Sequence, residues 1–386
     1  MKKIAIVTAT RAEYSLLTPL IRRVYTDNDL ELSLLVTGTH LSQKNGYTVS
    51  FIEEDGFPIA HRIPILEDGN RSYDISLTVA NAVKGFSKVF LEDRPDMVIV
   101  LGDRTEILGV AIAAMNERIP IAHIHGGEIT EGAVDDCVRH ALSKMSYLHF
   151  TSTEEYRKRV IQLGEHPERV FNVGALGTEN ILNTDMISGS ELRDILGIPE
   201  ERPYVVVTYH PVTLEQNDPQ SQIDVLCRAM EENDRYYYVI TASNADAGGD
   251  IINRTLTGFA ESHDNCCFRE TLGLKRYLSA VRSAAFVLGN SSSAIIEAPV
   301  LGTPTVNIGD RQRGRIMADT VVNCACEIEE INSAISKAGT MPHQPAQIFG
   351  DGHTSEKICD VIRRYLGDGD IDLMKGFYNI DFDVKD

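Results

Sequence analysis

Residues 97–125 read MVIVLGDRTEILGVAIAAMNERIPIAHIH, and this stretch decides the fold. The apolar run Met97–Leu101 ends at Gly102, an amphipathic stretch follows over residues 105–117, and a second apolar run spans Ile119–His125. Short apolar runs bounded by turn residues are typical of buried strands, and a helical stretch between two of them is typical of the crossover that joins parallel strands. The segment therefore predicts a strand–helix–strand unit of a parallel sheet.

The same alternation continues on both sides of this segment through the first half of the chain. It predicts further strands at Lys3–Ala9, Leu32–Thr37, Tyr147–Thr151 and Val170–Val173, and further helices at about 13–27, 74–92, 135–145 and 153–163. Strands that alternate with helices in this way predict one doubly wound, Rossmann-like domain.

A second unit of the same class begins after a polar stretch at about residues 184–203. Its predicted strands are Tyr204–Tyr209, Tyr236–Thr241, Cys266–Arg269, Ala285–Gly289 and Thr305–Ile308. A chain of 386 residues also exceeds what one hydrophobic core usually supports. We therefore expect an α/β fold with two Rossmann-like, doubly wound domains, over residues 1–177 and 178–366. The acidic tail at 367–386 either is disordered or packs across the domain junction and returns to the first domain.

Charge and apolar content exclude several classes of function. The chain has 37 Lys and Arg against 56 Asp and Glu, a formal net charge of −19, which repels nucleic acid and anionic membranes. No stretch is long and apolar enough to span a membrane, and the run Ile4–Val7 is too short for a signal sequence, so we expect a cytoplasmic protein with no nucleic-acid or membrane partner. The seven cysteines lack paired CxxC spacing, so neither a disulfide framework nor a zinc site is expected.

Charged residues gather where the predicted strands of the first domain end, which is where ligands bind in open α/β sheets. Asp103 and Arg104 follow the first of the two strands quoted above, and Glu128 and Asp135 follow the second. Taken alone, Asp103 fits a helix N-cap paired with Arg104. Taken with Glu128 and Asp135, it fits a group of carboxylates that raise one another's pKa and act as general acid and base.

His123 and His125 leave a second hypothesis open at the same place. Alternation along a strand would aim both side chains to one face, close to Glu128. His-x-His with a carboxylate can bind zinc or iron, but no further ligand stands at a recognisable spacing. We therefore expect no metal. We expect no cofactor either, because no GxGxxG follows the first strand.

Two helix starts are suited to bind an anion, because free backbone N–H groups lie there. The first follows the strand Lys3–Ala9 and carries Arg11 and Ser15. The second follows the strand Ala285–Gly289 and opens with three serines, at residues 291–293, where a bare N-cap needs only one. The sequence therefore predicts a diphosphate seat at the second of these helix starts.

Three other polar positions follow strands of the second domain. A glycine-flanked loop carries three arginines within five residues, Arg311, Arg313 and Arg315. These arginines either form a ligand-binding cluster or are a solvated run of charges. His210 stands before the proline that stops a strand, and either caps the strand or contacts a ligand. Asn244 lies in a segment that also fits a plain turn.

Nine motifs in this order resemble the hydrolysing UDP-N-acetylglucosamine 2-epimerases, bacterial enzymes of sialic-acid synthesis. The motifs are Thr10–Tyr14, Leu101–Arg104, His125–Glu128, Asp135–His140, His210-Pro211, Asn244–Gly248, Gly289–Ser292, Gly309–Arg315 and Phe349–Gly352. Together they cover essentially the whole chain. Leu16 stands where the non-hydrolysing relatives carry lysine, five positions after the arginine that matches Arg11, which favours the hydrolysing branch.

The resemblance implies two Rossmann-like domains with an interdomain cleft, as in GT-B type glycosyltransferases, and a homodimer or homotetramer. It implies that UDP-N-acetylglucosamine and water become N-acetylmannosamine and UDP, by elimination to 2-acetamidoglucal and then hydration. The implied roles are acid/base chemistry for Asp103, Glu128 and Asp135, diphosphate binding for His210, Ser291, Ser292 and Arg315, ribose binding for Glu297, and lining of the cleft for Arg11, Ser15, Arg104, Arg139 and Asn244.

Three alternatives remain open at this point. The same reaction on UDP-N,N′-diacetylbacillosamine is one, because the sequence does not reveal the pocket for the C4 and C6 substituents. A GT-B type glycosyltransferase is another, although three clustered carboxylates favour proton chemistry. A non-catalytic UDP-sugar sensor is the third, and it predicts binding without turnover.

Overall fold

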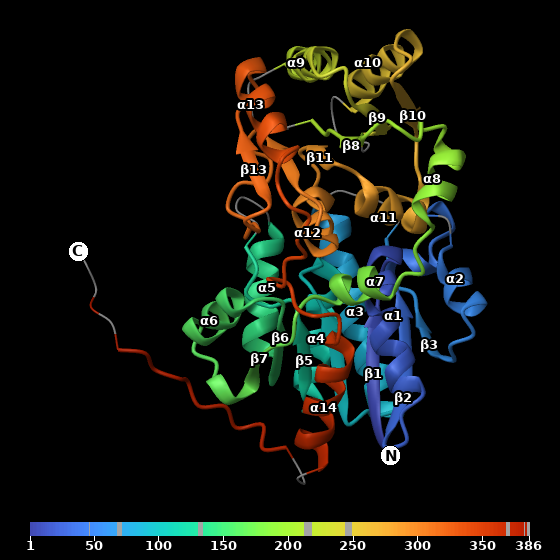
Figure 1. Cartoon of the computed structure of the whole chain (residues 1–386). Coiled ribbons are helices and arrows are strands. Elements are labelled where there is room, and N and C mark those ends of the chain that lie inside the picture. The colour runs from blue at the N-terminus through green and yellow to red at the C-terminus, as the bar shows by residue number, and fades with distance from the viewer. Residues whose placement is uncertain are drawn as a thin grey trace. The chain divides into compact units, whose positions relative to one another are not determined.

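The structure of the chain is a computed structural model that describes residues 1–45, 47–67, 72–129, 134–211, 218–243, 249–367, 371–381 and 383 (Figure 1). The chain forms two compact units. Unit 1 comprises Met1–Asn180 and Gly350–Asp386, and unit 2 comprises Ile181–Phe349. Each unit is built on a parallel sheet with helices packed on both faces, which confirms the predicted α/β class with two doubly wound domains.

Unit 1 has a seven-stranded sheet in the order β3-β2-β1-β4-β5-β6-β7. Its strands are β1 (Lys2–Thr8), β2 (Leu30–Thr37), β3 (Ile59–Ile63), β4 (Met97–Leu101), β5 (Ile121–Ile124), β6 (Leu148–Thr151) and β7 (Val170–Asn172). The strand order reverses between β1 and β4, and open α/β sheets bind ligands outside the carboxyl ends of the strands at such a switch point.

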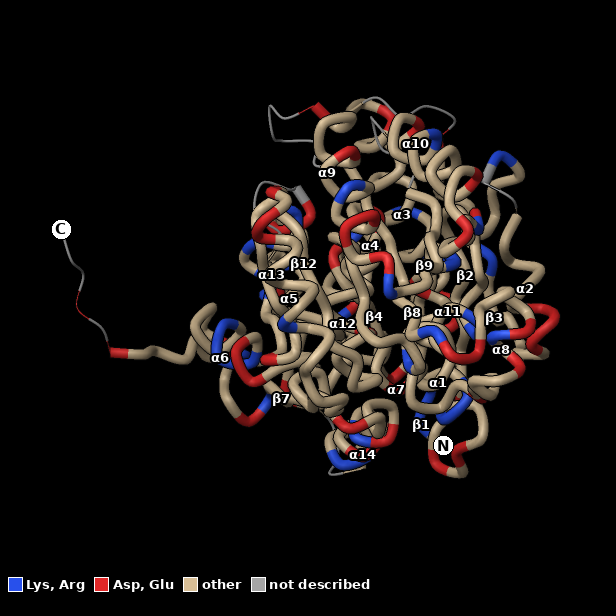
Figure 2. The backbone as a smooth tube through the Cα atoms, turned by 45° about the horizontal axis from the view of Figure 1, so that its top comes forward, with Lys and Arg blue, Asp and Glu red and all other residues tan. Residues whose placement is uncertain are grey.

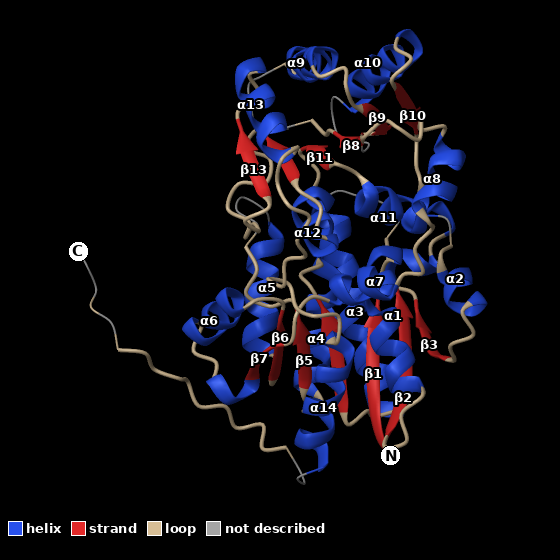
Figure 3. Ribbon diagram, in the orientation of Figure 1, coloured by secondary structure: helices blue, strands red, loops and turns tan. Residues whose placement is uncertain are grey.

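Helices cover both faces of this sheet, so alternate residues of each central strand enter different cores (Figure 3). Ile4 and Ile6 of β1 pack with α1 (Arg11–Tyr25) and α14 (Thr354–Gly367), whereas Ala5 and Val7 pack on the face of α3 (Ser72–Glu92), α4 (Thr105–Asn116) and α5 (Val134–Met145). The other helical segments of unit 1 are η1 (Gly38–Leu41), η2 (Gln43–Asn45), α2 (Val49–Glu54), α6 (Glu154–Gln162), η3 (Pro167–Arg169) and the start of α7 (Leu176–Asn183).

Unit 2 has a six-stranded sheet in the order β10-β9-β8-β11-β12-β13. Its strands are β8 (Tyr204–Thr208), β9 (Tyr237–Thr241), β10 (Cys266–Arg269), β11 (Phe286–Gly289), β12 (Thr305–Ile308) and β13 (Val321–Cys324). One core packs the sheet against α9 (Pro219–Glu232), α10 (Gly249–Ser262) and α13 (Ile328–Ala338), and the other against α8 (Gly189–Leu196), α11 (Gly273–Ser283) and α12 (Ser292–Leu301).

Two strands, β3 and β13, escape prediction from the sequence. Both are edge strands and are only partly buried, with His61 and Arg62 in β3 and Asn323 in β13. Edge strands keep one side in solvent, so they lack the continuous apolar run by which a central parallel strand is recognised.

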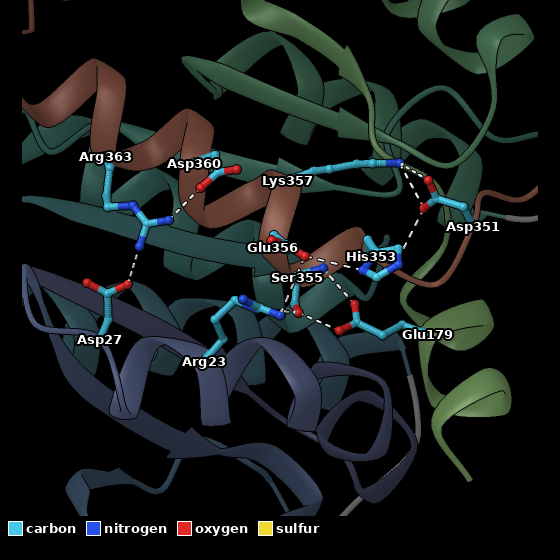
Figure 4. A network of polar contacts seen from close by, with 10 residues as sticks. All are labelled: Arg23, Asp27, Glu179, Asp351, His353, Ser355, Glu356, Lys357, Asp360 and Arg363. Atoms are coloured by element: carbon cyan, nitrogen blue, oxygen red, sulfur yellow. Dashed lines mark hydrogen bonds and ion pairs between the residues drawn. The ribbon is translucent and has the colours of Figure 1, made fainter.

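The chain returns to unit 1 at Gly350, whereas the predicted second domain extended to residue 366. Helix α14 buries Ile358 and Ile362 in the core that α1 lines. Figure 4 shows the polar contacts of this return: Glu179 accepts hydrogen bonds from the backbone N–H and the hydroxyl of Ser355, at 2.6 and 2.5 Å. Helix α14 therefore belongs to unit 1, although it follows unit 2 in the chain, because its apolar face packs into the core of unit 1.

Part of the C-terminal tail also lies against unit 1. The Lys375 ammonium pairs with the fully buried Glu165 carboxylate at 2.8 Å, and the backbone N–H of Tyr378 donates to the Gly164 carbonyl at 2.9 Å. The Phe377 ring lies so close to Gly164 that a Cβ there would be 2.2 Å from it. The tail residues Lys375, Phe377 and Tyr378 therefore pack on the first domain.

Charges of both signs are interspersed along the surface helices, as Figure 2 shows for α14 and α6. All seven cysteines carry free thiols. Within the described ranges, the structure contains no helix with the length and apolar character needed to cross a lipid bilayer.

Candidate active site

Asp103 stands just after β4, beyond a glycine with φ 74°. It is not the N-cap of α4, a position that Arg104 occupies, and its partner is Arg139 rather than Arg104. Burial raises the pKa of the Asp103 carboxyl above its usual value; Arg139 opposes this shift, and the charges of Asp135 and Glu128 add to it. Glu128 and Asp135 therefore lie close enough to Asp103 to influence its protonation.

Arg139, predicted to line the ligand site, is almost fully buried on α5. Its guanidinium pairs with Asp103 and donates to the backbone carbonyl of Glu128 at 2.9 Å and to Asp136 at 3.2 Å. These contacts tie the loop after β4 to the loop after β5. Arg139 is thus placed to hold the two carboxylate-bearing loops together.

The two histidines of the β5 motif have different surroundings, contrary to the alternation expected from the sequence. His123 is fully buried and bonds through its ring to Ser143 Oγ at 3.2 Å and to the Gly102 carbonyl at 2.7 Å. Burial lowers the pKa of His123 to about 3. His125 lies beyond the end of the strand with φ 66°, and its Nδ1 stands 3.3 Å from the Glu128 carboxylate.

The turn from His125 to Glu128 leaves no room for side chains at Gly126 and Gly127. A Cβ on Gly127, whose φ is 81°, would lie 2.4 Å from the Tyr156 carbonyl, and one on Gly126 would lie 2.9 Å from Ser143 Oγ. Ser152, just after β6, donates to Glu128 at 3.0 Å. Both glycines are therefore required sterically for Glu128 to reach the carboxyl ends of β5 and β6.

The start of α1 carries the next predicted group. Thr10 caps the helix, and Glu13 reaches back to the Ala9 N–H at 3.0 Å. Arg11 is exposed and lies over the Phe51 ring at 4.4 Å, while the exposed Ser15 donates to the Arg11 carbonyl at 2.9 Å.

Charged residues at the starts of α1 and α4 lie close to one another. The exposed Arg104 pairs with the buried Glu106 at 2.6 Å. Burial raises the pKa of Glu13 to about 7. The Ala9 N–H and the Arg104 charge oppose this shift, because they stabilise the ionised carboxylate. Glu13 and Glu106 had no place in the site predicted from the sequence, and their burial is a tertiary property that the sequence pattern does not reveal.

In unit 2, Ser291 is the N-cap of α12 and is 7% exposed, but its hydroxyl makes no capping hydrogen bond. Ser292 is the first residue of the helix. Ser293 donates to the Tyr277 hydroxyl at 2.7 Å and pairs closely with Glu297 one turn later. Burial raises the pKa of Glu297, and Ser293 opposes this shift. The helix start thus leaves N–H and hydroxyl donors for a ligand.

Asn290, which sequence reasoning gave no role, links the strand ends of unit 2. Its fully buried amide accepts from the His210 N–H at 2.7 Å and donates to the His210 carbonyl at 2.8 Å. The backbone carbonyl of Asn290 accepts hydrogen bonds from the side chains of Arg311 at 3.2 Å and Gln312 at 2.9 Å. Asn290 therefore fixes His210, the seat at Ser291 and the arginine loop to one another.

The arginine loop borders a cavity of about 900 Å³ in unit 2, lined among others by Tyr209, Asn307, Asp310 and Arg313. Arg315 is exposed on the same loop. His210 also bonds through its ring to Ser243 at 3.2 Å, so it contacts the loops after β9 and β11. The predicted contact Asn244 lies outside the described residues.

Among the described residues, no group of three or more His, Cys, Asp or Glu side chains is placed to hold a metal ion. The side chains at the strand ends are instead suited to proton transfer in unit 1 and to anion binding in unit 2.

Comparison with known proteins decides the family. The family model described as UDP-N-acetylglucosamine 2-epimerase matches residues 22–363. The chain belongs to this family. It is accordingly an enzyme of the 2-epimerase type, as the resemblance of its nine motifs predicted.

Three similar proteins illustrate the relationship. A Campylobacter jejuni protein named GDP/UDP-N,N′-diacetylbacillosamine 2-epimerase (hydrolyzing) is 40% identical over 87% of each chain. The Escherichia coli polysialic acid biosynthesis protein P7 is 40% identical over 87% of this chain and 86% of its own. The crystal structure of UDP-GlcNAc 2-epimerase from Neisseria meningitidis, bound to UDP-GlcNAc, matches with a TM-score of 0.76 over 94% of this chain and 100% of that one, at 16% identity. The last likeness establishes the fold alone.

Proposed function

We propose that this epimerase hydrolyses UDP-N-acetylglucosamine and inverts its C2, releasing N-acetylmannosamine for sialic-acid synthesis, and UDP. The observation that carries the proposal is that Arg139 joins the loops of Asp103 and Glu128 at the strand ends of unit 1, where the charges of Glu128 and Asp135 also act on Asp103. Sugar transfer needs no such group of acids and bases, whereas epimerisation needs one proton removed from C2 and another delivered there.

The proposed chemistry begins with elimination. The C2 hydrogen is weakly acidic, so it leaves only as the C1–O bond to UDP breaks, and the charge that develops on the diphosphate needs stabilisation at the same moment. The N–H groups and hydroxyls at Ser291 and Ser292, together with His210 and Arg315, are proposed to supply it, with Glu297 on the ribose. Water then adds at C1 of the 2-acetamidoglucal, and C2 is protonated from the opposite face.

The remaining predicted contacts keep the same proposed roles. Arg11, Ser15, Arg104 and Asn244 are proposed to line the substrate site, whereas the burial of Arg139 supports a positioning role. The interdomain cleft and the homodimer or homotetramer also remain predictions.

A second substrate is favoured by one observation. The Campylobacter jejuni relative, 40% identical to this chain, is named for UDP-N,N′-diacetylbacillosamine. The reaction would be unchanged, because C1, C2 and the UDP group are common to both nucleotide sugars.

The test is to incubate the enzyme with each nucleotide sugar, without an acceptor, in ²H₂O and in ¹⁸O-labelled water. We expect a free 2-epimeric sugar with deuterium at C2 and, before anomeric exchange, ¹⁸O on C1 and none on UDP. Slow UDP release without an acceptor would indicate a glycosyltransferase, binding without turnover a sensor, and accumulating UDP-N-acetylmannosamine a reversible epimerase.

A further inference from the structure

His125 is a non-glycine residue at the end of a buried strand with a left-handed backbone, φ 66°. Such a conformation costs an L-residue roughly 1–2 kcal/mol, so it persists only where surrounding contacts enforce it, and such residues cluster at functional sites. Here the His125 N–H donates to the Phe150 carbonyl at 2.9 Å, the Gly127 carbonyl accepts from Arg159 at 2.5 Å and the Glu128 carbonyl accepts from Arg139 at 2.9 Å. The turn is thus held from three sides.

The side chains of this turn form a chain of polar contacts. Ser152 donates to Glu128 Oε1 at 3.0 Å, and the same oxygen stands 3.3 Å from His125 Nδ1. The other ring nitrogen, Nε2, is shielded from solvent and has no hydrogen-bond partner among the described residues. An unpartnered buried polar atom costs about 1–3 kcal/mol, which a ligand placed against it would recover.

This arrangement has the geometry of a carboxylate-oriented imidazole. A carboxylate at Nδ1 fixes the ring and its tautomer, stabilises the imidazolium, and leaves Nε2 to exchange a proton with substrate. His140 pairs with Asp136 at 3.4 Å in a similar way, but it lies within α5 rather than at a strand end.

We propose that His125 Nε2 is the base that removes the C2 proton of the substrate, and that Glu128 is its positioning residue rather than the base itself. In this step the Nε2 lone pair takes the proton, the C2–H electron pair becomes the C1=C2 double bond, and the C1–O electron pair leaves with UDP. Asp103 and Asp135 then remain for the protonation of C2 from the other face. The inference rests on the proposed function and assigns one of its steps.

The test uses variants that the left-handed backbone tolerates. Asparagine and glycine adopt this conformation more readily than most residues, so His125→Asn and His125→Gly remove the imidazole without straining the turn. The matched control is His61→Gln, which breaks another histidine–carboxylate pair of unit 1, with Asp93 at 3.0 Å, on the edge strand β3.

Both partial reactions are measured for each variant: UDP release from the nucleotide sugar, and hydration of synthetic 2-acetamidoglucal in the presence of UDP. We expect His125→Asn to slow UDP release by at least ~10², with UDP affinity and glycal hydration within a few-fold of wild type. Added imidazole should restore part of the UDP release in His125→Gly, and His61→Gln should behave as wild type. Near-normal UDP release by His125→Asn, or equal loss of both partial reactions, would overturn the assignment.

The pH profile of kcat/KM in Glu128→Gln tests whether Glu128 positions His125 or itself takes the C2 proton. The titratable groups that face His125 are Glu128, whose carboxylate stands 3.3 Å from Nδ1, and the buried His123 of β5. If Glu128 only positions the ring, kcat/KM should fall in Glu128→Gln while the acidic limb of the profile persists. Loss of that limb altogether would make Glu128 the base. Wild-type enzyme that releases no UDP from either nucleotide sugar would overturn the proposed function and this inference with it.

Discussion

The strand ends of the two units carry different chemistry on the same kind of sheet. In unit 1 they carry ionised groups in close contact, with the buried Arg139 bound to Asp103 and to the loop of Glu128. In unit 2 the amide of Asn290 holds His210, its backbone carbonyl holds Arg311, and the serine-rich helix start lies just beyond it. The first set is suited to move protons, and the second to hold an anion without changing its own protonation.

The largest effect is expected from the carboxylates of unit 1. Asp103→Asn should lower kcat by at least ~10², because general acid–base groups contribute typically 10²–10⁴, and Glu128→Gln should lower it comparably because His125 then loses the carboxylate that orients its ring. UDP affinity, measured by calorimetry, should persist in both. Glu168→Gln, on a largely exposed side chain, is the control. Near-normal turnover in both site variants would refute the role of these carboxylates.

The strand-end glycines of the two units should differ in their tolerance of a side chain. In unit 2, a Cβ on Gly289 (φ 140°) would lie 2.0 Å from the Thr208 carbonyl, so Gly289→Ala should destabilise the protein by more than about 3 kcal/mol. In unit 1, a Cβ on Gly102 (φ 74°) would meet no atom within 4 Å, so Gly102→Ala should cost only about 1 kcal/mol. Urea unfolding followed by circular dichroism measures both, and equal shifts would contradict the packing described here.

Changes at the helix start of unit 2 should alter binding rather than chemistry. The double variant Ser291→Ala, Arg315→Ala should weaken UDP binding by at least ~100-fold, because each hydrogen bond to a charged group contributes about 1.5–3 kcal/mol. Calorimetry with UDP measures this loss. Arg228→Ala, on an exposed arginine of α9, should leave affinity unchanged. Unaltered UDP affinity in the double variant would move the diphosphate elsewhere.

The smallest effect is a pH dependence of stability that arises in unit 1. The folded-state pKa of Glu13 is raised to about 7 from 4.5, so its contribution to stability is present below about pH 4.5 and is lost as pH rises through 7. Glu13→Gln should therefore stabilise the protein at pH 8, by at most ~3 kcal/mol, and have little effect at pH 4.

Glu165→Gln provides the opposite sign in the same unit. Burial would raise the pKa of Glu165, but hydrogen bonds from His149, Lys144 and Lys375 lower it to about 2. Its contribution is therefore present above about pH 4.5 and is lost as pH falls toward 2, so this variant should destabilise the protein at pH 7. Thermal melts of both variants at pH 4, 6 and 8 measure the change in Tm relative to wild type. If this change varied with pH in the same direction in both variants, the environments described for Glu13 and Glu165 would be contradicted.

The sequence by itself determined the two doubly wound sheets and the motifs at their strand ends. Central parallel strands are buried on both faces, so runs such as Met97–Leu101 are recognisable without tertiary information. Residues that follow such strands are placed at one sheet edge by topology alone, which is why Asp103, Glu128 and Ser291 were identified as candidate site residues from the sequence.

Only the tertiary structure decided what those residues contact. The edge strands β3 and β13 lack a continuous apolar run, and α14 joins unit 1 because its apolar face completes that core. Arg139, predicted to line the ligand site, is a buried link between two loops, Asn290 joins the strand ends of unit 2, and His125 has a left-handed backbone. Hydrogen-bond partners, burial and a left-handed φ depend on segments far apart in the chain, so local sequence patterns do not encode them.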